Sequence, residues 1–224
     1  MSEKTYNEYE LVNRQILNFY MVQERIPIIN DVNIYNISKN EIGERTNKLT
    51  QITYPDVYRE LLEEKKYNIL INDESIISLH YIFDDENKIK KHSLSFIPSL
   101  DLEICLSDEQ TLDNRIVILQ NTNNYLRIDY DKTGKKNIIH TDVHMHFGIF
   151  HTEYEKEYSE LRIPLEGILY PNEFIYLIFK YMYDVDDEYV NFLLEDTYIK
   201  KHRLEDCELD KLILSFNRNS FVTS

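Results

Sequence analysis

Hydrophobic residues recur at helical spacing near the start of the chain. Four of them lie three or four positions apart, at Tyr9, Val12, Ile16 and Phe19. That spacing places side chains on one face of a helix. Thr5 and Glu8 before this run form a capping-box pattern, in which Glu8 would accept a hydrogen bond from the Thr5 amide. The sequence therefore predicts a helix over residues 6–22.

The following segment, residues 27–50, is polar and weakly periodic, which predicts an ordered connector without regular structure. A second helix start comes at residues 53–56, where Pro55 occupies the first turn and Asp56 favours the helix dipole. A buried stripe follows at Val57, Leu61 and Leu62. We expect a second helix there.

The middle of the chain changes to short runs rich in β-forming residues, separated by turn formers such as Asn72-Asp73. These runs predict strands at 67–71, 75–83, 88–97, 115–120, 125–130, 143–149 and 161–168. The connections are too short for crossover helices, so the sheet should be mainly antiparallel.

The last part of the chain is predicted to be helical. Pro171 opens an apolar helix that runs to about Tyr183, and helical patterns follow around residues 189–194 and 209–216. We expect one α+β domain over residues 1–224: an N-terminal helical part (1–66), a curved, mainly antiparallel sheet of about six or seven strands (67–168) and C-terminal helices (169–224).

Composition narrows the class of protein. Its 224 residues fit a single domain, and 25 Lys+Arg against 40 Asp+Glu give a net charge of −15. Such a charge argues against non-specific binding to nucleic acid or to an anionic membrane. No run is long enough to span a bilayer, and residues 1–5 do not resemble a signal peptide, so we expect a cytoplasmic protein.

Several common catalytic sites are excluded by the residues available. The two cysteines, Cys105 and Cys207, lie far apart and form no CxxC pair, which disfavours a disulfide framework or a zinc ribbon. Four glycines leave no phosphate-binding loop, and GxSxG and HExxH patterns are absent.

Five polar residues are predicted to share one face of the sheet. Side chains alternate along a strand, so Arg127 points the same way as Asp129, and His144 the same way as His146. Arg162 alternates with apolar neighbours on a third strand. If the three strands are neighbours, all five side chains converge.

Three interpretations of this face remain open. It could be a polar lattice that only sets strand register. It could hold a divalent metal ion through His144 and His146, completed by Asp129, His140 or Asp142. It could also bind an anion, with Arg127 and Arg162 as forked donors and either histidine as donor or general acid. Elsewhere, His80, His92 and His202 need no functional role.

The segment Asp184–Asp210 holds ten acidic and three basic side chains, nearly half of the net charge. The simplest explanation of this charge is a surface exposed to solvent. The functional explanation is a surface that docks to a basic protein partner.

Four short motifs carry a resemblance to a known family. They are Arg127-Ile128-Asp129-Tyr130, His144-Met145-His146-Phe147-Gly148, Arg162-Ile163-Pro164, and Leu169-Tyr170-Pro171 leading into Phe174-Ile175. This series, between Tyr125 and Tyr183, resembles the bacterial domain of unknown function family 2290. The resemblance implies no activity, and it implies a neighbourhood of mobile-element and phage-defence genes. The acidic segment His151–Glu160 departs from the family pattern and separates Arg162 from His146.

The leading hypothesis is a non-catalytic accessory subunit without a cofactor. It would recognise an anionic or protein ligand through Arg127, Asp129, His144, His146 and Arg162 within a larger bacterial assembly that serves phage defence or belongs to a mobile element. The first alternative is a metal-dependent phosphoesterase or nuclease that uses Asp129, His144 and His146. The second is an acidic protein that mimics nucleic acid.

Overall fold

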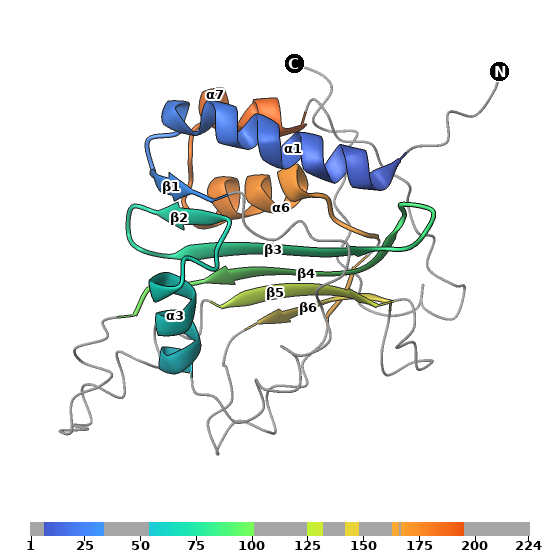
Figure 1. Ribbon diagram of the computed structural model, residues 1–224. Helices are drawn as coiled ribbons and strands as arrows, with labels where there is room; N and C mark the ends of the chain where they lie inside the picture. Colours follow the sequence, from blue (N-terminus) through green and yellow to red (C-terminus); the bar gives the residue numbers. More distant parts are fainter. Residues whose placement is uncertain are drawn as a thin grey trace.

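The computed structural model describes residues 7–33, 54–100, 125–131, 142–147, 163–165 and 167–194, with the backbone alone at 54–57. These residues form an α+β structure in which helices pack on an antiparallel sheet (Figure 1). Several predicted features lie outside the described residues: the strand at 115–120, the helix at 209–216, Arg162, His140, His151 and both cysteines.

The sheet has seven strands among the described residues, and their spatial order follows their order in the chain. They are β1 (Ile29–Val32), β2 (Ile69–Ile71), β3 (Ile76–Phe83), β4 (Ile89–Ile97), β5 (Leu126–Asp131), β6 (Val143–Phe147) and β7 (Ile163–Pro164). Every neighbouring pair is antiparallel, as predicted. The sheet is not strongly curled (Figure 1).

The prediction of an irregular connector over residues 27–50 is wrong for β1. This strand pairs with β2, and the register is interrupted between Ile29 and Asp31. Of its four residues only Val32 is buried, while Asn30 is exposed. A strand so short and polar has no alternating pattern to reveal it, and only its pairing with β2 defines it.

The described helices agree with the periodicity of the sequence. They are α1 (Glu8–Val22), followed by the 3-10 turn η1 (Gln23–Arg25), α3 (Tyr54–Glu63), and α6 (Pro171–Leu177), which continues into the π-helical turn η2 (Ile178–Met182). The short helix α7 (Asp187–Val190) and the 3-10 turn η3 (Asn191–Leu194) follow. None of the helices in this part of the chain is both long and apolar enough to cross a bilayer.

The predicted start of α1 needs correction. Asn7 is the N-cap, and its side chain accepts a hydrogen bond from the Glu10 amide at 3.3 Å. Thr5 lies outside the described residues, and the Glu8 carboxylate accepts a hydrogen bond from the Ile89 amide at 2.5 Å. The carboxylate therefore joins α1 to the start of β4, a contact with no local sequence signal.

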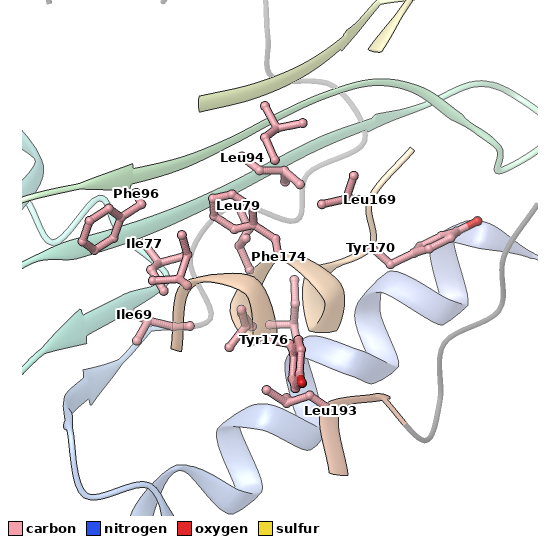
Figure 2. Packing of buried hydrophobic residues seen from close by; sticks show 14 of the residues in the cluster. Ile69, Ile77, Leu79, Leu94, Phe96, Leu169, Tyr170, Phe174, Tyr176 and Leu193 are labelled. Carbon is pink, nitrogen blue, oxygen red and sulfur yellow. The ribbon is translucent and has the colours of Figure 1, made fainter. Parts of the chain in front are cut away.

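The main hydrophobic core lies between the sheet and the layer formed by α1 and α6 (Figures 1 and 2). Phe174 and Phe179 are fully buried, and the rings of Phe19 and Phe179 lie 6.2 Å apart between the two helices. Leu79 and Leu94 meet them from the central strands (Figure 2).

A smaller cluster lies on the opposite face of the sheet, beneath α3 (Figure 1). Its buried members are Tyr58, Tyr67, Leu70, Ile76, Ile97, Leu100 and Tyr125. This cluster covers one end of that face. The remainder of the same face, on β4, β5 and β6, carries polar residues.

Candidate functional site

The polar face arises from strict alternation along β5 and β6. Arg127 lies directly opposite His146, and Asp129 lies directly opposite His144. Residues opposite each other in an antiparallel pair project to the same side of the sheet. The apolar residues between them, Ile128 among them, are buried in the main core. The structure thus brings four of the five predicted site residues together.

Asp129 lies at the centre of this group, and each of its carboxylate oxygens has its own partners. Oδ1 accepts a hydrogen bond from the Ser93 hydroxyl at 2.8 Å. Oδ2 lies 2.8 Å from Arg127 Nε and 3.4 Å from His146 Nε2. The carboxylate therefore has a fixed orientation.

The protonation state of Asp129 follows from these neighbours. Burial by itself raises the pKa of a carboxyl group, but the hydrogen bond from His146, the charge of Arg127 and the Ser93 hydroxyl outweigh it. They hold the pKa of Asp129 well below its usual range. The group is thus an anion at neutral pH, the form that binds metal ions.

The two imidazoles are buried beside this carboxylate. His144 is 2% exposed and His146 is 7% exposed. Their ring centroids lie 4.7 Å apart in an edge-to-face arrangement. One ligand atom from each of Asp129, His144 and His146 lies within 4.8 Å of the other two. Among the described residues this is the one such cluster of potential metal ligands.

The geometry of the cluster fits a metal ion. Two ligands of a tetrahedral zinc ion lie about 3.3 Å apart, because each zinc–ligand bond measures about 2.0–2.1 Å. The separation of 3.4 Å between His146 Nε2 and Asp129 Oδ2 is close to that distance. Two imidazoles and one carboxylate favour zinc, iron or manganese over magnesium or calcium, which prefer oxygen ligands throughout.

The family model described as "Uncharacterized conserved protein (DUF2290)" matches residues 20–223, which is most of the chain. The chain belongs to this DUF2290 family. Neither a curated protein nor a solved structure matches it. The family description names no activity, so the function of this DUF2290 chain has to be argued from its own residues.

Arg127 supplies the positive charge of the site in this DUF2290 chain. Burial lowers the pKa of the guanidinium, but Tyr125 and Asp129 outweigh that effect and raise it, so Arg127 stays charged. Its side chain is 32% exposed. The nearby Lys91 is paired with Asp131 at 2.6 Å. Arg127 is therefore the cation placed beside the histidines.

Sequence reasoning missed Ser93. The alternation along β4 could have pointed to Ser93, because Lys91, Ser93 and Ser95 alternate with buried residues and so share one face of the strand. Ser93 faces Asp129 across the β4–β5 pair. The sequence could not show this, because the pairing partner of β4 is not encoded locally.

Asp142 and His92 lie outside the cluster of Asp129, His144 and His146. Asp142 is not part of the converging cluster, although it precedes β6. His92 points into the main core, with the rings of Tyr81 and Tyr130 each 5.7 Å away. Burial lowers the pKa of His92 to about 4, so this histidine is neutral. It packs as an aromatic core residue.

Proposed function

We propose that this protein is a metal-dependent phosphoesterase whose divalent ion is held by Asp129, His144 and His146. The observation that carries the proposal is the convergence of one carboxylate and two imidazoles, with ligand atoms within 4.8 Å of one another. Three protein ligands leave at least one coordination position for water or substrate, as in catalytic zinc sites.

The residues of the site would have different roles in this reaction. A bound divalent ion supplies a Lewis acid and lowers the pKa of a coordinated water. Asp129 contributes a negative charge, and each of the two buried imidazoles would contribute one ring nitrogen. The partly exposed guanidinium of Arg127 is suited to hold a phosphoryl oxygen next to the ion.

The charge of the whole protein favours a small substrate over a nucleic acid. A net charge of −15 repels a polyanion, and polynucleotide binding requires several unpaired cations. On this face Lys91 is already paired with Asp131. Among the described residues of this face, Arg127 keeps a partly exposed guanidinium beside its contact with Asp129, which suits a single phosphate group. A low-molecular-weight phosphoester is therefore favoured over a nuclease substrate.

Metal content measured by elemental mass spectrometry tests the proposal. We expect close to one equivalent of zinc, manganese or iron in the tag-free wild type, and none in the His144→Ala/His146→Ala double variant. His80→Ala is the matched control, because His80 lies on the same face of the sheet, opposite Ser93. Metal-loaded wild type should then hydrolyse p-nitrophenyl phosphate. Wild type that takes up none of the three metals contradicts the proposal.

The second candidate function is the non-catalytic subunit that recognises an anionic ligand or a protein. The partial exposure of Arg127 supports it. Its weakness is that Asp129 already neutralises this guanidinium at 2.8 Å. Binding of inorganic phosphate by metal-free protein, abolished in Arg127→Gln, would favour this candidate.

A protein partner remains a separate proposal. Four acidic side chains lie within the described part of the Asp184–Asp210 segment, at Asp184, Asp186, Asp187 and Glu188. Of these, Asp187 is paired with Lys180 at 2.8 Å. A basic partner would meet the other three, and its binding should weaken as the salt concentration rises.

A further inference from the structure

We infer that Ser93 is a positioning residue of the proposed metal site. Its hydroxyl holds Oδ1 of Asp129 so that Oδ2 remains directed at the ion. This inference rests on the proposed function, because it concerns the same three ligands. It assigns a role to a residue on a strand that contributes none of them.

The register of the sheet places Ser93 where this role requires it. Ser93 of β4 lies directly opposite Asp129 of β5, and Asp129 lies directly opposite His144 of β6. The three side chains therefore form one row across neighbouring strands. The hydroxyl of Ser93 donates to Oδ1 over 2.8 Å, and its acceptor is an anion, which makes a stronger hydrogen bond than a neutral acceptor.

The two oxygens of the Asp129 carboxylate have different partners, and the Ser93 hydroxyl contacts Oδ1. Arg127 reaches Asp129 through Nε at Oδ2, as does His146 through Nε2. Without a partner for Oδ1, the carboxylate could rotate to form a two-pronged pair with the guanidinium, which is the preferred geometry of arginine with a carboxylate. Rotation would withdraw Oδ2 from His146. Ser93 thus keeps Oδ2 on the side of His146, where a bound ion would take the place of their direct contact.

This role differs from that of a hydrogen bond that only aligns two strands. An aligning hydrogen bond affects the stability of the metal-free protein and leaves the intrinsic metal affinity unchanged. Partners that orient a metal ligand commonly change metal affinity by about 10–100-fold when they are removed. Metal affinity and the spectrum of the bound metal therefore separate the two roles.

The test compares Ser93→Thr with Ser93→Val. Both replacements are β-branched and suit a strand, and they have nearly the same shape, but only threonine keeps the hydroxyl. Cobalt(II) replaces zinc as the probe, because its visible absorption reports the ligand geometry. Zinc affinity is measured by competition with a chelator. Ser78→Val, on the same face of β3, is the matched control.

We expect Ser93→Val to bind zinc about 10–100-fold more weakly than wild type and to show an altered cobalt spectrum. Ser93→Thr and Ser78→Val should stay close to wild type in both measurements. Equal zinc affinity and identical cobalt spectra in Ser93→Val and wild type would overturn the inference and leave the metal site intact. Equal weakening in the threonine and valine variants would also overturn it, because the hydroxyl would then not matter.

Failure of the proposed function looks different. In that case wild type itself binds neither cobalt nor zinc, and the role of Ser93 falls with the site. A urea unfolding curve for each metal-free variant shows whether it is folded. If the valine variant does not fold, Ser93→Ala takes its place, since alanine adds no bulk to the strand.

Discussion

The hydroxyl of Tyr81 donates a hydrogen bond to the carbonyl oxygen of Leu169 at 3.0 Å, joining β3 to the segment that enters α6. Both residues are buried, and 88 positions separate them in the chain. A buried carbonyl that loses its hydrogen-bond donor destabilises the folded protein, because the carbonyl has lost its hydrogen bonds to water and gains none in return. This contact helps to hold the start of α6 against the sheet.

Tyr81→Phe should therefore lower the free energy of unfolding by about 1–3 kcal/mol, because it leaves the Leu169 carbonyl without its donor. Urea unfolding followed by circular dichroism measures the change. Tyr20→Phe is the control, since Tyr20 is 40% exposed on α1 and should change stability by less than about 0.5 kcal/mol. A Tyr81 variant as stable as wild type would show that the hydroxyl contributes nothing.

Gln15 tests the contact between α1 and α6. It is fully buried, and its Oε1 accepts a hydrogen bond from the Asn172 amide at 3.2 Å. That amide belongs to the first turn of α6, where the helix itself offers no acceptor. Gln15→Ala should destabilise the protein by about 1–3 kcal/mol in urea unfolding. Asn18→Ala, at an exposed position of α1, should have little effect.

The buried His92 predicts a loss of stability in mild acid. Its pKa is about 4 in the folded protein and 6.5 ordinarily, so between these values the unfolded chain binds a proton that the folded protein does not. Stability should fall as the pH decreases from about 6.5 to 4, by about 3 kcal/mol from this group. His92→Phe removes the titrating group and keeps an aromatic ring, so its urea midpoint should depend less on pH. Equal pH dependence in the two proteins would contradict this assignment.

Zinc should raise the melting temperature of the wild type. Binding at a free concentration about 100-fold above the dissociation constant adds about 2.7 kcal/mol, which corresponds to about 5–10 °C for a chain of this size. Asp129→Asn should abolish the shift, because the amide oxygen carries no charge. Differential scanning fluorimetry measures it.

Asp131→Asn is the matched control for the zinc experiment. Asp131 lies on the same strand and face, two residues beyond Asp129, and pairs with Lys91 rather than with a histidine. This variant should keep the full zinc-induced shift. If both variants lose it, the effect is not specific to the proposed site.

Much of the fold could be predicted because its signals are local. Helical spacing revealed α1, and Pro171 marked the first residue of α6. The prediction failed for β1, where a short edge strand lacks alternation, and at the N-cap of α1. Glu8, part of the expected capping box, accepts a hydrogen bond from Ile89, which is distant in sequence.

The sequence by itself determined which residues share a face within each strand. Arg127 and Asp129 lie on one side of β5, and His144 and His146 on one side of β6, since side-chain alternation is a property of the extended backbone. Only the tertiary structure decided that Asp129 faces both His144 and Ser93. Strand pairing and register depend on packing between distant segments, and a shift of one residue would send every side chain to the other face.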